Sequence, residues 1–186
     1  MKTTLDADLK SGALHDHLAD IAEAAAQVIL PYWRTGAEVF AKADDSPVTL
    51  ADQEAEALIL SRLAALYPKV PAVAEEQAEA QGKPSQAARR FWLIDPLDGT
   101  KGFVAGKESF TVNIALIENG RPVAGVVTAP ANAVTWRTAP GGGAEMRRFG
   151  EAWRTIRVRN RPDEGIALLS HSVSDEEAAR LAARHG

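Results

Sequence analysis

The amino-acid sequence predicts an α+β fold in which two N-terminal helices pack on a mainly antiparallel sheet. Two long stretches near the N-terminus carry apolar residues at the three- and four-residue spacing of one helical face. After about residue 70 the pattern changes to short extended segments that are bounded by glycine and proline. Helices followed by a run of strands are the order expected of an α+β domain.

The first helix is predicted from about Asp6 to Arg34, and Pro31 should end it because proline has no backbone N–H to donate. The second helix is predicted from about Leu50 to Leu66. Thr49 is a suitable N-cap, and the charge of an aspartate in the first turn suits the helix dipole. The apolar face of this second helix is predicted to comprise Leu58, Ile59, Leu63 and Leu66.

The strands are predicted over residues 71–74, 91–94, 110–117, 123–128, 134–138, 155–158 and 166–170. Asn119-Gly120 is typical of a two-residue hairpin turn, and Gly141-Gly142-Gly143 is interpreted as a longer hairpin loop. The polar stretch from Gln77 to Gln86 is the nearest to a linker. Ser174 and Glu177 form a capping box that predicts a final helix ending near residue 185.

Composition excludes several classes of protein. The chain has 186 residues, no cysteine and a net charge of −4, so it is neither a disulfide-stapled module nor a cysteine-ligated zinc module. An acidic chain without a basic stripe is not expected to bind nucleic acid. Because the sequence has neither an apolar run of about 20 residues nor a signal-like N-terminus, a cytoplasmic location is expected.

The most informative stretch runs from Trp92 to Thr100. A buried strand is expected to deliver Asp95 at its end, and Pro96-Leu97 is expected to turn the chain so that Asp98 returns to the same point. Clustered carboxylates together with a backbone carbonyl, here that of Leu97, are the oxygen ligands that Mg²⁺ prefers.

A second acidic pair strengthens this interpretation. Glu75-Glu76 follows the predicted strand 71–74, so two strands end in acidic residues at one sheet edge. By itself either stretch would be interpreted as a turn or as solvated surface. Four acids at one edge would repel each other by several kcal/mol unless a cation neutralised them. Gly99 and Thr100 are interpreted as the start of a helix whose N–H groups could hold a phosphate.

Asp52, Glu75-Glu76 and the stretch from Asp95 to Thr100 together resemble the signature of the inositol monophosphatase superfamily of magnesium-dependent phosphatases. The resemblance runs from about Leu14 to Arg180. Ser46 to Thr49, Lys101 with Phe103, and Phe110 to Ile117 are similar to the bacterial 3′(2′),5′-bisphosphate nucleotidases of the CysQ type. The resemblance implies a layered α/β/α sugar-phosphatase fold, with a metal-phosphatase domain over residues 1–160 and the beginning of a C-terminal α/β half over residues 161–186.

The resemblance also implies roles for individual residues. The expected metal ligands, for two or three Mg²⁺ ions per site, are Glu75, Asp95, the carbonyl of Leu97, and Asp98. The expected catalytic residues are Asp52, Glu76 and Thr100, with Thr100 hydrogen-bonded to Asp52. The expected substrate-binding residues are Glu75, Leu97, Asp98, Gly99 and Thr100.

The implied reaction is conversion of adenosine 3′,5′-bisphosphate, a by-product of sulfate assimilation, to AMP and phosphate. Inositol phosphate and histidinol phosphate are alternative substrates. Two departures bear on this: Gly102 stands where the nucleotidase branch usually has glutamate, and none of Trp33, Trp92, Trp136 and Trp153 is followed by the aspartate of the family's later Trp-Asp motif. A truncated protein that binds metal or phosphate without turnover is therefore a further hypothesis.

The remaining polar residues receive simpler interpretations. His15 and His17 are expected to be solvated, and His171 could line a nucleoside pocket by resemblance. The arginines between Arg147 and Arg161 are expected on solvated strand faces. The sequence leaves open whether the protein forms a homodimer or associates peripherally with the inner face of the cell membrane.

Overall fold

The computed structural model describes residues 4–35, 39–41, 47–81, 88–160, 162–163, 169 and 173–185. The chain forms two compact units, Met1–Ile156 and Arg157–Gly186. Ser46, His171 and most of the predicted strand 166–170 lie outside the described residues. In the second unit the C-terminal helix α6 spans Asp175–His185, and the backbone N–H of Glu177 donates to Ser174 Oγ at 3.2 Å, which confirms the predicted helix and its cap.

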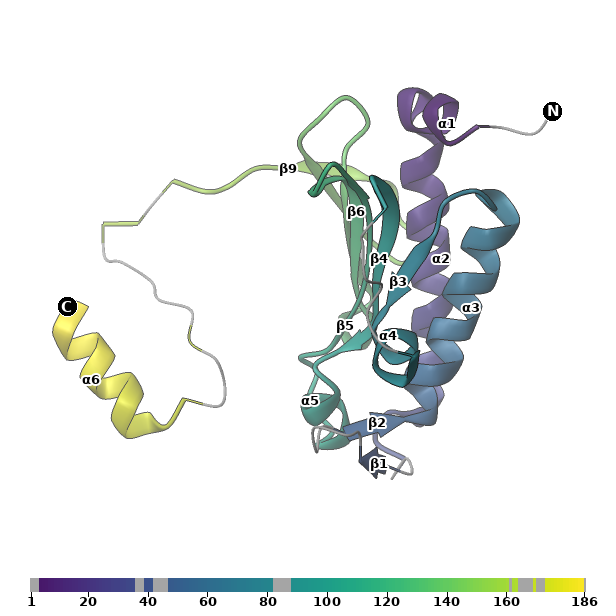
Figure 1. Cartoon of the computed structure of the whole chain (residues 1–186). Helices are drawn as coiled ribbons and strands as arrows, with labels where there is room; N and C mark the ends of the chain where they lie inside the picture. Colours follow the sequence, from purple (N-terminus) through teal and green to yellow (C-terminus); the bar gives the residue numbers. More distant parts are fainter. Residues whose placement is uncertain are drawn as a thin grey trace. The chain divides into compact units, whose positions relative to one another are not determined.

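The first unit is built on a seven-stranded sheet with the strand order β3-β4-β5-β6-β7-β8-β9 (Figure 1). The β3–β4 pair is parallel, and each other neighbouring pair is antiparallel. The strands are β3 (Ala72–Ala74), β4 (Arg90–Asp98), β5 (Thr111–Glu118), β6 (Arg121–Ala129), β7 (Val134–Thr138), β8 (Ala144–Arg148) and β9 (Arg154–Ile156). The predicted α+β class is thereby confirmed.

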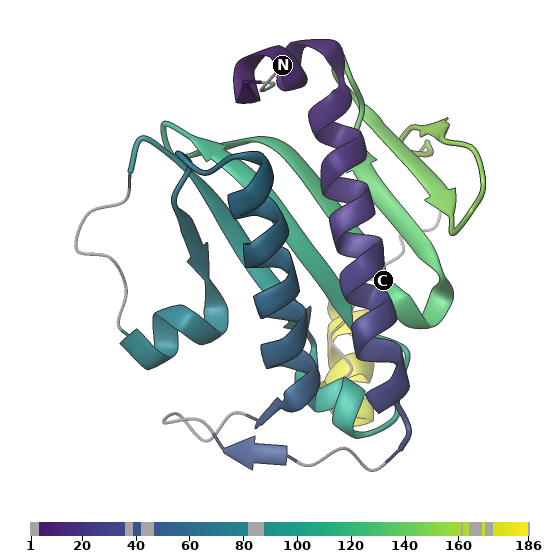
Figure 2. The ribbon, with the colours of Figure 1, turned by 90° about the vertical axis from the view of Figure 1, so that its right-hand side faces the viewer.

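Helices α2 (Ala13–Ile29) and α3 (Leu50–Leu66) lie side by side on one face of the sheet (Figure 2). Every second side chain of β4 and β5 faces this helical layer, as the two-residue period of a strand requires. The resulting core contains Leu14, Leu18, Ile21, Ile59, Leu63, Trp92, Ile94, Val112, Ile114 and Leu116. Burying this many large apolar side chains supplies the main favourable free energy of folding.

The N-terminal helix is broken where a continuous helix was predicted. Helix α1 (Leu5–Ser11) ends at Gly12, whose φ of 92° is left-handed, and α2 starts directly after it. Pro140 in the β7–β8 loop packs so close to Gly12 that a Cβ at this position would lie 2.9 Å from Pro140 Cγ, and glycine, which has no Cβ, avoids this contact. The proline-terminated end is confirmed, because α2 passes into a short 3-10 turn, η1 (Leu30–Tyr32).

Helix α3 has the predicted bounds, and its predicted face is confirmed for Ile59 and Leu63, with Leu58 packed against the core, but not for Leu66. Ala51, Ala55, Ile59 and Leu63 are buried at four-residue intervals, whereas Leu66 is 39% exposed. The short hairpin β1 (Val39–Ala41) and β2 (Pro47–Thr49) precedes α3 and was not predicted.

Further elements differ from the prediction. Strand β8 was missed, β9 begins one residue before the predicted strand and ends two residues earlier, and the start of the supposed linker forms helix α4 (Glu75–Gln81). The Asn119-Gly120 turn is confirmed, with φ values of 52° and 74° that fit a type I′ hairpin. Among the described residues, no helix is both long enough and apolar enough to cross a bilayer.

Three polar side chains predicted to be solvated are packed instead. His15 is 4% exposed, and His17 Nδ1 lies 2.7 Å from the hydroxyl of Tyr67. Arg147 pairs with Glu23 at 2.8 Å and covers the ring of Trp153. Each of these contacts joins segments far apart in the chain, which is why local periodicity did not reveal them.

Candidate active site

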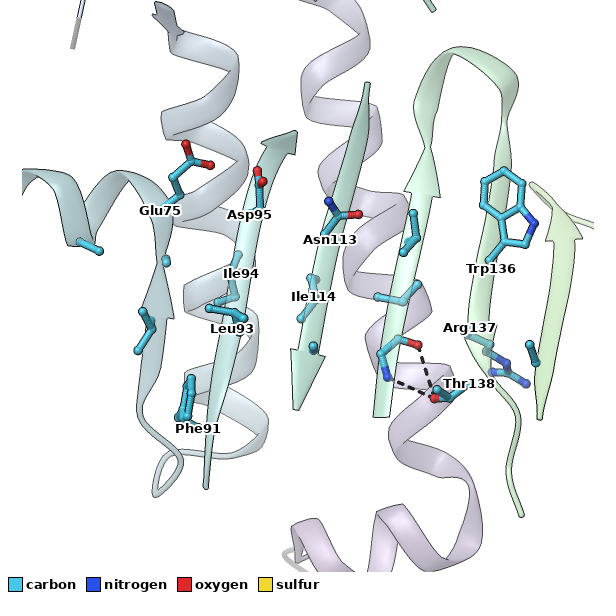
Figure 3. A pocket seen from close by; sticks show the side chains of 18 residues that line it. Glu75, Phe91, Leu93, Ile94, Asp95, Asn113, Ile114, Trp136, Arg137 and Thr138 are labelled. Carbon is cyan, nitrogen blue, oxygen red and sulfur yellow. Dashed lines mark hydrogen bonds between the residues drawn. The ribbon is translucent and has the colours of Figure 1, made fainter. Parts of the chain in front are cut away.

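The two acidic stretches meet because β3 and β4 run parallel. Their register pairs Ala74 with Ile94, so Glu75, the first residue after β3, lies next to Asp95 of β4. Figure 3 shows the two carboxyl groups side by side at that end of the sheet. The expected meeting of these two acids is therefore confirmed, although β4 was predicted to end at Ile94 and runs on to Asp98.

The surroundings of Asp95 disfavour its ionised form. The pKa of Asp95 is raised to about 8. Burial is the largest cause, followed by the charge of Glu75, the hydrogen bond between Asp95 and Glu75, and the charge of Asp98. Its Oδ1 atom is buried without a hydrogen-bond partner among the described residues. A buried oxygen beside a second carboxylate is the kind of position that a hard cation occupies.

The backbone that leads to Asp98 differs from the predicted turn. Strand β4 continues to Asp98, and the register with β5 shifts between Asp95 and Asp98, so Pro96-Leu97 forms a bulge rather than a turn. The Asp98 carboxylate is exposed and accepts a hydrogen bond from Asn113 Nδ2 at 3.4 Å. Among the described residues, no group of three or more histidine, aspartate or glutamate side chains is arranged to hold a metal ion.

Asp52 and Thr100 are in contact, as the resemblance led us to expect. Thr100 Oγ1 lies 3.2 Å from Asp52 Oδ1 and 2.9 Å from the Leu97 carbonyl oxygen. The other Asp52 oxygen accepts from the backbone N–H and the hydroxyl of Thr49 at 2.7 and 2.6 Å, which completes the capping box of α3. Burial raises the pKa of Asp52, although the hydrogen bonds from Thr49 and Thr100 act in the opposite direction.

Helix α5 (Thr100–Val104) starts directly after the acidic motif, as predicted. Gly99 precedes it with a φ of 91°, and a Cβ there would lie 2.6 Å from the Ser109 carbonyl oxygen. Phe103 anchors the helix through edge-to-face packing against Phe110, with ring centroids 5.1 Å apart. The motif is thus fixed between a bulged strand and a short helix that is held by the core.

Glu56 belongs to this site and was not identified from the sequence. It is 6% exposed and lies one turn after Asp52 on α3. Its two carboxylate oxygens accept the backbone N–H groups of Glu76 and Gln77 at 2.9 and 3.0 Å. A sequence signal existed, since a glutamate four residues after Asp52 and next to Ala55 falls on the buried helix face.

Within the first unit, none of the described helices covers the sheet face opposite α2 and α3, and this face carries a hollow of about 980 Å³. Glu75 and Asp95 lie at one end of it, and apolar side chains of β4, β5 and β6 form much of its floor (Figure 3). The Thr138 hydroxyl lies 3.1 Å from the N–H of Gly125 at the other end. We call this region the open-face hollow; its lining includes Val73, Phe91, Leu93, Ala115, Val127 and Trp136.

The predicted site residues therefore fall into two neighbouring groups. Glu75 and Asp95 face the hollow, and Asp98 lies close enough for its charge to act on Asp95. Asp52 and Thr100 lie together beside the Leu97 carbonyl. Glu76 is half-buried at the start of α4, and its backbone is held by Glu56.

A model of the inositol monophosphatase family matches residues 13–184 of the chain. The chain is 43% identical over 144 residues to the 3′(2′),5′-bisphosphate nucleotidase CysQ of Salmonella typhimurium, covering 73% of this chain and 54% of the relative. It is 40% identical over 148 residues to CysQ of Escherichia coli, covering 75% and 55%. The chain thus spans about half the length of these curated relatives.

Solved structures give the same result for the fold. The structure of CysQ from Bacteroides thetaiotaomicron superimposes with a TM-score of 0.71 at 29% identity, covering 95% of this chain and 70% of that one. An extragenic suppressor protein suhB from Bartonella henselae gives a TM-score of 0.67 at 28% identity, covering 80% and 55%. The predicted sugar-phosphatase fold is confirmed.

Proposed function

The chain belongs to the inositol monophosphatase family, and from this we propose that it is a magnesium-dependent phosphatase that converts adenosine 3′,5′-bisphosphate to AMP and phosphate. Enzymes of this family act on small phosphorylated molecules. The choice of substrate is supported by relatives at 40–43% identity that are named 3′(2′),5′-bisphosphate nucleotidases.

One observation supports the metal most strongly. Asp95 Oδ1 is buried and has no hydrogen-bond partner among the described residues, and the Glu75 carboxylate lies beside the same residue. Mg²⁺ usually keeps several waters and binds through one or two carboxylates, so this pair fits it. Glu75, Asp95 and the Leu97 carbonyl would hold this ion, and Asp98 would contribute to a second one; the Leu97 carbonyl has a second lone pair beyond the one directed at Thr100.

The protein's own residues would orient the attacking water. Bound Mg²⁺ would supply positive charge for the phosphate and make a nearby water more acidic. The Thr100 hydroxyl has one proton, which it can donate to Asp52 or to the Leu97 carbonyl. When it donates to Asp52, its oxygen can accept a hydrogen bond from the water; as the proton of the water passes to Thr100, the proton of Thr100 would pass to the Asp52 carboxylate. Asp52 is itself fixed by Thr49, so it can keep the hydroxyl in this orientation.

The backbone at the start of α5 would receive the phosphate. The N–H groups of Gly99 and Thr100 lie before the first intrahelical hydrogen bond, which the N–H of Phe103 makes to the Gly99 carbonyl. They would donate to phosphate oxygens without a basic side chain.

Phosphate release from three substrates tests the proposal. We expect phosphate release from adenosine 3′,5′-bisphosphate to depend on Mg²⁺. Its kcat/KM should exceed the values for inositol phosphate and histidinol phosphate by at least about tenfold. A difference of about 1.4 kcal/mol in transition-state binding gives this discrimination. Equal rates on all three would contradict the choice of substrate while leaving the phosphatase activity in place.

A second substrate is favoured by one comparison. The chain is 40% identical over 128 residues to a histidinol-phosphatase of Chlorobaculum parvum, covering 68% of this chain and 48% of the relative. Preferential release from histidinol phosphate in the same assay would support this alternative. Metal binding without turnover on any of the three substrates would instead support a non-catalytic metal-binding protein.

A further inference from the structure

Helix α4 carries two acidic residues of the site, and the residue before it cannot cap it with a side chain. It begins at Glu75 directly after β3, and the preceding residue is Ala74. Alanine is a poor N-cap because it offers no acceptor for the first N–H groups of the helix. A helix of 7 residues is also too short to be stable by itself in water.

Glu56 supplies the missing cap from another helix. Its two oxygens accept the N–H groups of Glu76 and Gln77 at 2.9 and 3.0 Å, one bond for each oxygen. A negative charge at this end also suits the dipole of α4. Because Glu56 is 6% exposed, little water competes for these bonds, and they hold the first turn of α4 against α3.

The position of this turn decides where Glu75 lies. Glu75 is covalently joined to Glu76, and its carboxyl lies in contact with that of Asp95. Both carboxylates must be ionised to bind a cation, and in that form they repel each other, so a backbone that is held in place is needed to keep them together. Parallel pairing with β4 holds Ala74 on one side of Glu75, and Glu56 holds Glu76 and Gln77 on the other side.

We propose that Glu56 is a positioning residue for the metal site: it holds the first turn of α4 so that the Glu75 carboxylate stays beside Asp95. This inference rests on the proposed function, since it concerns the cation bound there. Glu56 is assigned this role through its bonds to the backbone N–H groups of Glu76 and Gln77, and not as a ligand of the ion. It acts through Glu75.

The test measures metal binding without substrate, using the whole chain and Mn²⁺ as the paramagnetic probe. Free Mn²⁺ is followed by electron paramagnetic resonance in the wild type, in Glu56→Gln and in Glu54→Gln. In Glu56→Gln the side-chain amide would offer its oxygen as an acceptor to one N–H but turn its NH₂ group toward the other. Glu54→Gln makes the same charge change at an exposed position of the same helix.

We expect Glu56→Gln to weaken Mn²⁺ binding by about tenfold or more, as the loss of outer-shell partners of metal ligands typically does. Glu54→Gln should bind with nearly the affinity of the wild type. In ¹⁵N spectra of the metal-free chain, the amides of Glu76 and Gln77 should shift in Glu56→Gln and stay in place in Glu54→Gln. A purely structural role would lower the melting temperature of Glu56→Gln and leave its Mn²⁺ affinity unchanged below that temperature.

The outcomes distinguish a failure of the role proposed for Glu56 from a failure of the metal site itself. Equal Mn²⁺ affinity in folded wild type and folded Glu56→Gln overturns the role of Glu56 and leaves the metal site in place. Absence of Mn²⁺ binding by the wild type overturns the metal site itself, and the role of Glu56 with it. If Glu56→Gln does not fold, Glu56→Asp replaces it: its carboxylate keeps the charge but is one methylene too short to reach both N–H groups, so the same loss of affinity is expected.

Discussion

Asp95 is the residue whose chemistry most clearly depends on a cation. Its pKa of about 8, against an ordinary value of 3.8, means that the metal-free folded chain keeps a proton that the unfolded chain releases near pH 4. Between these values the folded state binds more protons, so the free energy of unfolding of the metal-free chain should fall as the pH rises. A single titrating group can change the free energy of unfolding by at most about 1.4 kcal/mol per pH unit. The slope due to Asp95 should be smaller than this, because its half-buried carboxyl is partly screened by water.

Urea unfolding between pH 4 and pH 8 in the presence of a chelator checks this prediction. Asp95→Asn should remove this part of the slope, whereas Asp163→Asn, at an exposed position, should retain it. Excess Mg²⁺ should stabilise the wild type most at pH 8, because the ion favours the ionised carboxylate. Identical pH profiles for the wild type and Asp95→Asn would contradict the assignment.

At the scale of single elements, the turn from β4 into α5 depends on Gly99. Alanine there would combine a φ of 91° with a Cβ only 2.6 Å from the Ser109 carbonyl oxygen. Gly141 has a similar φ of 84° and nothing within 4 Å of its Cβ position, so Gly141→Ala carries only the backbone strain. We expect Gly141→Ala to cost about 1 kcal/mol and Gly99→Ala at least about 2 kcal/mol in urea unfolding. If both variants lost the same free energy of unfolding, the close contact with the Ser109 carbonyl would contribute nothing, and the prediction would be contradicted.

Elements defined by local chemistry were predictable, and elements defined by distant contacts were not. The Asn119-Gly120 hairpin and the Thr49 cap follow from residues within a few positions of each other. The break at Gly12 depends on Pro140, and the cap of α4 depends on Glu56, about 20 residues earlier in the sequence. Pro96-Leu97 has a turn-like composition, but hydrogen bonding to β5 on both sides makes it a bulge.

The same division holds for the site. The pairing of Glu75 with Asp95 could be predicted, because acids that follow adjacent parallel strands must meet. Asn113 could not be placed beside Asp98, because its position depends on the β4–β5 register after the bulge.

At the scale of the whole molecule, the open face of the sheet predicts association. Leu93 and Val127 line the open-face hollow and are 47% and 41% exposed. Contiguous apolar surface of this kind favours contact with other molecules. We expect size-exclusion chromatography with light scattering to give a mass that rises with concentration. Leu93→Gln combined with Val127→Thr should shift the chain toward the monomer, whereas Leu66→Gln on the helical layer should not. A monomer at every concentration would contradict this prediction.

The central claim is that the Glu75–Asp95 pair holds the cation with which the chain hydrolyses a phosphomonoester. Phosphate release from adenosine 3′,5′-bisphosphate by the 186-residue chain, with and without Mg²⁺ and in Asp95→Asn, tests it most directly. We predict release that requires Mg²⁺ and falls by more than about 100-fold in the folded Asp95→Asn variant, because the ion supplies most of the charge stabilisation. Release that persists in a chelator, or that is unchanged in Asp95→Asn, would contradict the claim.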